Sequence, residues 1–265
     1  MTLLVKPTTA DGANPVLTVT PESAGWEHVG FSVYRLEPGQ TLSLNADSRE
    51  RCLVPVVGAF SAQVDEQTFA SVGGRQDLFS RELTSHLYVP EHASVELVAQ
   101  TPLELAVCSA PGGLGLPARL ITPEQQGQSV RGQGTNTRYI NDILPDTQPA
   151  SGLLVVEVYT PAGHWSSYPP HKHCVDNMPH ESALEETYYH RIQPESGFAF
   201  QRVYTDDRRI DETMAVENGD CVMVPEGYHP VGAAHGYDIY YLNVMAGPKR
   251  VWKFKNDPQH EWMIG

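Results

Sequence analysis

Residues Cys52-Leu-Val-Pro-Val-Val-Gly58 run directly into Ala59-Phe-Ser-Ala-Gln-Val-Asp65. Both runs are short and rich in apolar residues, and a glycine separates them. Runs of this length and composition between turn residues predict β-strands rather than helices. Similar runs continue on both sides, from about Gly30 to Ala110, at residues 31–36, 87–90, 94–99 and 103–109. This rhythm indicates a sandwich or barrel of antiparallel strands.

The same pattern returns after Gly152, with expected strands at residues 153–160, 186–192, 199–204, 213–216, 220–225 and 237–245. The content of 22 glycines and 21 prolines also favours an all-β fold with many turns. In addition, Leu87-Tyr-Val-Pro-Glu-His92 in the first half echoes Val222-Met-Val-Pro-Glu-Gly-Tyr-His229 in the second. We therefore expect an internal duplication: an N-terminal domain at 1–115, a linker or crossover at 116–150, and a C-terminal domain at 151–265.

The charge balance argues against some classes of partner. Eighteen basic and thirty-two acidic residues give a net charge of −14, which disfavours binding to nucleic acid or to an anionic membrane. It leaves room for a small anionic substrate at a local basic cluster. Four scattered cysteines, no signal-peptide pattern and no apolar run of membrane-spanning length lead us to expect a cytoplasmic protein.

A candidate metal site stands out in the second half. His171 and His173 are two residues apart, so on a β-strand both imidazoles point to the same face. Glu185 and Glu186 compete for the role of carboxylate ligand, because adjacent strand residues face opposite sides; we expect Glu186 to be the ligand. His229 follows the turn-forming Pro225-Glu-Gly and supplies a third imidazole. Three nitrogens and one oxygen suit a divalent transition metal with positions open for a substrate.

Two segments could contact an anionic substrate. Val130-Arg-Gly-Gln-Gly-Thr-Asn-Thr-Arg138 is polar and glycine-rich, and it is either a solvated crossover between domains, the favoured interpretation, or an anion-binding segment. Strand periodicity puts Arg202 and Tyr204 on one face, where Arg202 either grips a substrate carboxylate or forms a salt bridge with its neighbours. Lys172 is a further expected substrate contact, and one of Tyr240 and Tyr241 should point inward.

Several motifs closely resemble one family. They are Tyr168-Pro-Pro-His-Lys-His, Leu184-Glu-Glu-Thr-Tyr-Tyr, Gly197-Phe-Ala-Phe-Gln-Arg-Val-Tyr-Thr-Asp-Asp, Val224-Pro-Glu-Gly-Tyr-His-Pro-Val and Tyr240-Tyr-Leu-Asn-Val-Met-Ala-Gly-Pro. On these residues the chain is similar to the 5-deoxyglucuronate isomerases, cupin-fold uronate ketol-isomerases of bacterial inositol catabolism. The resemblance extends over most of the sequence and is densest from residue 152 onward.

The resemblance implies a bicupin: two antiparallel β-barrel or jelly-roll domains, a degenerate one first and a metal-binding one second. It implies aldose–ketose isomerisation of 5-deoxy-D-glucuronate to 5-dehydro-2-deoxy-D-gluconate. The metal ligands carried over by position are His171, His173, Glu186 and His229. The cofactor is one divalent transition metal, with zinc as first choice ahead of Mn, Fe, Ni or Co. The partner is a small sugar acid, and a homo-oligomer is possible.

The catalytic base stays open among Glu185, Tyr188 and Tyr241. An enediol path needs such a base, whereas a hydride shift does not. Two other functions fit the same ligand set: an iron-dependent cupin dioxygenase and a non-catalytic sugar-binding cupin. Metal content, oxygen consumption and turnover would separate the three.

Overall fold

The computed structural model describes residues 2–9 and 14–264 and confirms the all-β prediction. The chain divides into two compact units. The C-terminal unit comprises Met1–Lys6, Gly127–Asp142 and Val156–Gly265, and the N-terminal unit comprises Pro7–Gln126 and Ile143–Val155. Residues 4–5 and 127–142 belong to the C-terminal unit because their strands join its largest sheet.

The N-terminal unit contains two antiparallel sheets. The six-stranded sheet has the order β11 (Arg119–Ile121), β8 (His86–Val89), β5 (Arg49–Val57), β10 (Leu103–Pro111), β3 (Gly30–Leu36) and β2 (Leu17–Val19). The four-stranded sheet has the order β4 (Thr41–Leu44), β9 (Val95–Ala99), β6 (Ala59–Val64) and β7 (Gln67–Gly73). Residues 52–65 thus contain most of β5 and all of β6.

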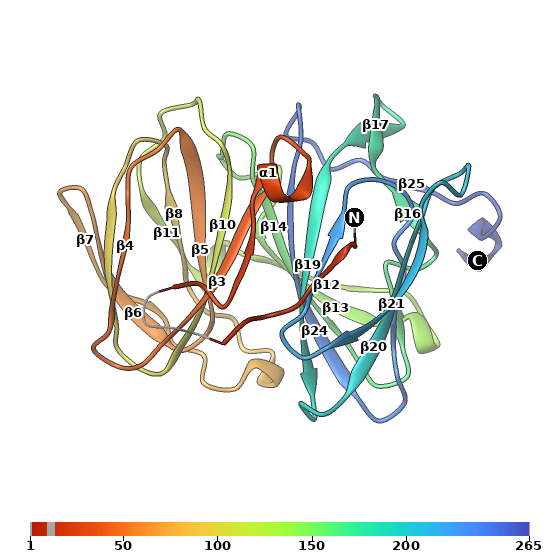
Figure 1. Cartoon of the computed structure of the whole chain (residues 1–265), viewed down its shortest axis with the longest axis horizontal. Helices are drawn as coiled ribbons and strands as arrows, with labels where there is room; N and C mark the ends of the chain where they lie inside the picture. The colour runs from red at the N-terminus through yellow and green to blue at the C-terminus, as the bar shows by residue number, and fades with distance from the viewer. Residues whose placement is uncertain (1, 10–13, 265) are drawn as a thin grey trace. The chain divides into compact units, whose positions relative to one another are not determined.

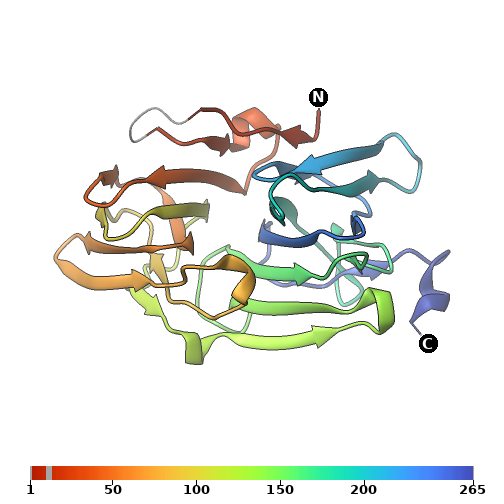
Figure 2. The ribbon, with the colours of Figure 1, turned by 90° about the horizontal axis from the view of Figure 1, so that it is seen from below.

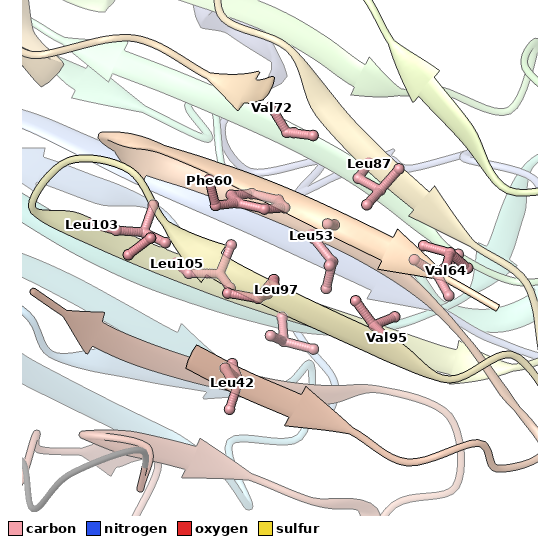
Figure 3. Close-up of a cluster of buried hydrophobic side chains, with 14 of the residues drawn as sticks. Leu42, Leu53, Phe60, Val64, Val72, Leu87, Val95, Leu97, Leu103 and Leu105 are labelled. Atoms are coloured by element: carbon pink, nitrogen blue, oxygen red, sulfur yellow. The ribbon is translucent and has the colours of Figure 1, made fainter. Parts of the chain in front are cut away.

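An apolar core joins these two sheets. Leu53 and Leu105 from the six-stranded sheet meet Phe60 and Leu97 from the four-stranded sheet, and all four are fully buried. Figure 3 shows these side chains pointing toward one another. Burying each such side chain contributes about 1.5–3 kcal/mol, so this interior is a stabilising core rather than a pocket.

The C-terminal unit repeats the plan. Its seven-stranded sheet has the order β1 (Leu4–Val5), β22 (Cys221–Val224), β19 (Glu185–Gln193), β24 (Asp238–Ala246), β14 (Leu154–Thr160), β13 (Arg138–Leu144) and β12 (Gly127–Arg131). Its four-stranded sheet has the order β15 (Trp165–Ser166), β23 (Val231–Ala233), β20 (Phe198–Tyr204) and β21 (Asp211–Glu217). Two small ribbons pair β16 (His171–Lys172) with β25 (Lys255–Asn256) and β17 (Cys174–Asn177) with β18 (Glu181–Ala183).

Helical structure is sparse. It consists of α1 (Pro21–Ala24) and the 3₁₀ turns η1 (Leu78–Ser80), η2 (Pro123–Gln125), η3 (Gly134–Asn136) and η4 (Glu261–Met263). Thr20 caps α1 by accepting a hydrogen bond from the Ser23 backbone N–H, at 3.1 Å. Within the described part of the chain, no helix has the length and apolar character needed to cross a bilayer.

The strand orders support the expected duplication. The run β8-β5-β10-β3 in one unit corresponds to β22-β19-β24-β14 in the other, so the two copies of the Val-Pro-Glu motif end equivalent strands. The edge strand β1 adds the start of the chain to the C-terminal unit, where Figure 1 draws it in red among blue and cyan strands.

The segment expected to be a linker or crossover is largely structured. Residues 127–131 and 138–144 form β12 and β13, which pair in the register Arg131↔Arg138 and Ser129↔Ile140. Figure 2 shows this hairpin as two neighbouring yellow-green ribbons. Its bend needs a glycine, because Gly132 has φ +79° and a Cβ there would lie 2.1 Å from the Asn136 carbonyl oxygen. The hairpin therefore extends the seven-stranded sheet of the C-terminal unit.

Candidate active site

Three histidines converge inside the C-terminal unit. His171 lies in β16, His173 follows that strand, and His229 stands between β22 and β23. Their potential ligand nitrogens all lie within 4.8 Å of one another. The turn before His229 depends on Gly227, which has φ +92° and whose Cβ, if present, would lie 2.5 Å from the Tyr204 carbonyl oxygen. That turn brings the third imidazole to the other two.

Glu186 completes the cluster from β19. Its Oε2 lies 2.9 Å from Nε2 of His173 and 3.3 Å from Nε2 of His229. The carboxylate is 2% exposed, so it is as buried as these imidazoles. Glu185 precedes it on the strand and therefore points to the other face, and it does not line the cavity described below.

The hydrogen bonds of two imidazoles orient them as ligands. Nδ1 of His229 lies 2.8 Å from the Gly227 carbonyl oxygen, and Nδ1 of His173 lies 3.2 Å from the Leu184 carbonyl oxygen. A carbonyl only accepts, so each Nδ1 carries a proton and each ring directs its Nε2 toward Glu186. Nε2 of His229 has no hydrogen-bond partner among the described residues. Lone pairs that converge in this way fit a divalent metal ion.

The pKa shifts agree with this assignment. Burial lowers the pKa of His229 to about 4, and burial, followed by the charges of His229 and His173, holds the pKa of His171 well below its usual value. Both rings are therefore neutral at physiological pH, as metal ligation requires. Burial opposes a charge on His173, but the adjacent Glu186 carboxylate outweighs it and raises the pKa of that ring. A proton on His173 would occupy the place that a cation would otherwise take.

His171 and Glu186 of the cluster line a cavity within the C-terminal unit. It consists of an inner hollow of about 30 Å³ and an outer hollow of about 550 Å³, which share Arg131, Arg138 and His171 in their linings. The outer volume lies in the range typical of small-molecule sites. The inner hollow is lined by Arg131, Arg138, Ile140, Val156, Val158, Ser167, His171, Glu186, Tyr188, Tyr241, Asn243 and Trp252.

Two arginines give this cavity a local positive charge. Arg131 and Arg138 are directly opposite each other in the β12–β13 pair. Arg131 lies over the Trp252 ring at 5.4 Å, and Nη1 of Arg138 donates to the Asn136 and Tyr168 carbonyl oxygens at 3.1 and 3.2 Å. Neither guanidinium has a carboxylate partner among residues 2–9 and 14–264. Burial, together with the charge of Arg131, lowers the pKa of Arg138.

Two tyrosines and an amide form a polar wall. The rings of Tyr188 and Tyr241 are 4.9 Å apart, and the hydroxyls of Tyr188 and Ser167 are hydrogen-bonded at 2.9 Å. Burial raises the pKa of both phenols, so both are protonated at neutral pH. Asn243 is 5% exposed, and its Nδ2 has no hydrogen-bond partner in the described structure. These groups can donate hydrogen bonds to substrate oxygens.

Three expected substrate contacts lie away from this cavity. Arg202 forms a two-pronged salt bridge with Asp211, at 2.7 and 2.8 Å, on a partly exposed face of β20. Tyr204 is buried, and its hydroxyl donates to Asp257 at 2.8 Å. Lys172 points away from the histidines that flank it and pairs with Asp206, beside a separate hollow of about 300 Å³. For Arg202 the structure corresponds to the salt-bridge alternative.

Arg131 and Arg138 line the cavity, although anion contact was the less favoured of the two interpretations of residues 130–138. The signal was present, since both guanidinium groups lie in the segment considered for anion contact. The missing information was the pairing register, which puts residues 131 and 138 on the same face toward the histidines. Asn243 was not considered, although strand alternation places it on the same face as Tyr241.

The fold and the buried histidine cluster define a two-domain cupin. Oxalate decarboxylase from Bacillus subtilis has the same fold, with a TM-score of 0.67 at 14% identity over all of this chain and 82% of that one. An IolB-like protein from Salmonella typhimurium LT2 is much more similar, with a TM-score of 0.97 and 50% identity over the whole of both chains.

The chain belongs to the KduI/IolB family, whose sequence model matches residues 3–263. Among its curated relatives is the 5-deoxy-glucuronate isomerase of Geobacillus thermodenitrificans, 57% identical over 249 residues, which are 94% of this chain and 91% of the relative. The protein of the same name from Bacillus subtilis is 48% identical over 256 residues, 96% of this chain and 94% of the relative. These matches confirm the family resemblance found in the sequence.

Proposed function

We propose that this protein is an isomerase of 5-deoxy-glucuronate, which it converts from aldose to ketose. One observation carries the proposal: His171 and Glu186 of the metal-ligand cluster line the same hollow as two arginines without carboxylate partners. A sugar acid has complementary chemistry, with a carbonyl at one end and a carboxylate at the other. The names of the curated relatives support the same substrate.

The residues that would hold the metal are His171, His173, Glu186 and His229. A divalent ion bound there supplies Lewis acidity toward the carbonyl end of the sugar. Three imidazoles and a carboxylate suit Zn, Mn, Fe, Ni or Co, and we take zinc as the first candidate.

The arginines bind and orient the substrate. A guanidinium matches a carboxylate through two parallel N–H···O bonds, so Arg131 and Arg138 together hold the C6 carboxylate firmly. The positioned carboxylate fixes the distance of C1 and C2 from the histidine cluster. Trp252, which lies beside Arg131, helps to exclude water from the bound sugar.

The phenols of Tyr188 and Tyr241 act as proton donors to the substrate. Isomerisation moves one hydrogen from C2 to C1 and one proton from the C2 oxygen to the C1 oxygen, so the carbonyl shifts from C1 to C2. The hydroxyls of Tyr188 and Tyr241 are protonated at neutral pH and donate to the two oxygens as their charge changes. In an enediol path, a group in the cavity removes the C2 proton. Of the three expected bases, Glu185 does not line the cavity, and Tyr188 and Tyr241 line it as protonated phenols, which suits them to proton donation rather than to removal of the C2 proton.

The decisive experiment combines elemental analysis of the purified protein with an NMR assay of 5-deoxy-glucuronate. We expect a bound divalent transition metal, conversion to the 2-keto sugar and no consumption of oxygen. Oxygen consumption would instead indicate a dioxygenase, and binding without conversion a sugar-binding protein. Substrate deuterated at C2 separates the paths, because complete transfer of deuterium to C1 without solvent exchange would exclude the enediol.

A further inference from the structure

The strand order divides the cavity into three chemical zones. Across the seven-stranded sheet, the order is β12, β13, β14, β24 and β19. The first two strands carry Arg131 and Arg138, and the last two carry the polar wall and Glu186. Between these zones lie side chains without any polar atom: Ile140 on β13, and Val156 and Val158 on β14.

This apolar strip faces the cavity and not the opposite side of the sheet. Val156 and Val158 are two residues apart, so they share a face, whereas Glu157 between them bonds to Asn141 at 2.8 Å and Tyr240 at 3.1 Å on the other. Ile140, Val156 and Val158 are 4%, 2% and 5% exposed. A bound ligand would therefore meet an aliphatic surface just beyond the arginines.

The orientation of the substrate determines which carbon meets this strip. With the carboxylate on Arg131 and Arg138 and the carbonyl end at the histidine cluster, the chain of a hexuronate crosses β13 and β14. The carbon attached to the carboxylate is C5. Ile140 is two residues beyond Arg138 on the same face of β13, about 6.6 Å along the strand, so it lies beside this position.

We propose that Ile140, Val156 and Val158 form a specificity wall that selects sugar acids without a hydroxyl group at C5. This inference rests on the proposed function, which supplies the direction of the substrate. A C5 methylene contributes favourable binding free energy when it is buried against three aliphatic side chains. A C5 hydroxyl in the same place loses its water and receives no hydrogen bond from the wall. The substrate class is thus 5-deoxy-uronates in preference to uronates.

The test adds a hydroxyl to the wall without changing its shape. Val158→Thr and Val156→Thr replace a methyl by a hydroxyl group that can pair with a C5 hydroxyl. For each variant, kcat/KM and the dissociation constant are measured with 5-deoxy-glucuronate and with D-glucuronate. The two sugars differ in their ring forms in solution, but that difference is common to all variants and cancels when selectivity ratios are compared.

Val244→Thr is the matched control. Val244 is fully buried in β24, next to Asn243 and on the opposite face, so its substitution brings a similar cost of a buried hydroxyl outside the cavity. We expect the preference for 5-deoxy-glucuronate to fall about tenfold or more in Val158→Thr or Val156→Thr and to be unchanged in Val244→Thr.

The outcomes separate this inference from the proposed function. If the wild-type protein isomerises 5-deoxy-glucuronate but both wall variants keep its selectivity, the wall is wrong and the function stands. If the wild type isomerises neither sugar, the proposed function fails. The specificity wall is then tested by the dissociation constants of the two sugars alone. A smaller binding preference for 5-deoxy-glucuronate over D-glucuronate in the wall variants alone would then support the specificity wall. An unchanged preference in these variants would overturn it.

Discussion

Arg131 and Arg138 are directly opposite each other on neighbouring strands, and neither has a carboxylate partner in the described part of a chain that carries a net charge of −14. Like charges at opposed positions of a β-pair destabilise the fold. The chain has ample acidic residues to neutralise them, as Asp211 does for Arg202. The repulsion between Arg131 and Arg138 therefore lowers the stability of the free protein, and a bound anionic substrate would offset this repulsion.

We predict that Arg138→Ala raises KM for the sugar acid about 10- to 100-fold, because a charge-assisted contact contributes about 1.5–3 kcal/mol. Arg138→Lys should recover only part of the loss, since an ammonium group cannot form the two-pronged contact. Steady-state kinetics measure both effects.

Arg202→Ala is the control for this substitution, since Arg202 is paired with Asp211 outside the cavity. It should leave KM within about twofold of the wild type, as expected for an exposed salt bridge. Removal of Arg138 should also keep or raise the melting temperature of the ligand-free protein. A large loss of stability with an unchanged KM would identify a structural role for Arg138.

The sequence predicted the ligand cluster better than the substrate contacts, for a physical reason. Strand alternation, which is local, groups His171 with His173 and allows only one of Glu185 and Glu186 to join them, and a glycine turn precedes His229. Alternation also groups Arg202 with Tyr204 but does not say which face of the strand lies inside. In the structure the inward residue is Gln201, which is fully buried and bonded to His190 at 2.9 Å.

The equivalent position in the N-terminal unit has a different role. The register pairs Tyr188 with Asn243 in one unit and Leu53 with Val107 in the other. Leu53 belongs to the apolar core, so the duplicated position fills space instead of lining a pocket. Equivalence of this kind depends on pairing between distant strands, which the short Val-Pro-Glu echo alone could not establish.

The adjacent carboxylates allow a clean test of the ligand set. Glu186→Gln should lose most of the bound metal and the activity, because a neutral amide replaces the carboxylate beside His173 and His229. Glu185→Gln, one residue away on the other face, should retain both. Elemental analysis of the two purified variants decides the matter, and equal metal contents would contradict the assignment.

Tyr188 is the phenol expected to matter most for turnover. Its ring lies 5.6 Å from that of His229, and its raised pKa keeps the proton available for donation. We predict that Tyr188→Phe lowers kcat about 100-fold with little change in KM, as for loss of a positioned proton donor. Tyr240→Phe is the control, because Tyr240 donates to Glu157 on the opposite face of the sheet. Similar losses in both variants would point to a structural effect.

His190 should make folding stability depend on pH below neutrality. The ring is fully buried behind Tyr188, and burial lowers its pKa from 6.5 to about 4. Below pH 6.5 the unfolded chain binds a proton at this residue, whereas the folded protein does not until the pH approaches 4. Stability is therefore complete above pH 6.5 and falls by about 3 kcal/mol between pH 6.5 and 4.

Urea unfolding of the metal-free protein at pH 7.5 and 4.5 measures this contribution, because metal release then cannot interfere. His190→Gln removes the titrating ring, so its loss of unfolding free energy between the two pH values should be smaller than that of the wild type by about 2–3 kcal/mol. His180→Gln, at an exposed turn, should behave like the wild type. The same pH dependence in His190→Gln and the wild type would mean that the imidazole gains a proton without leaving the core. In that case the buried surroundings of His190, including Gln201, would accommodate the protonated imidazole despite the cost of burying a charge.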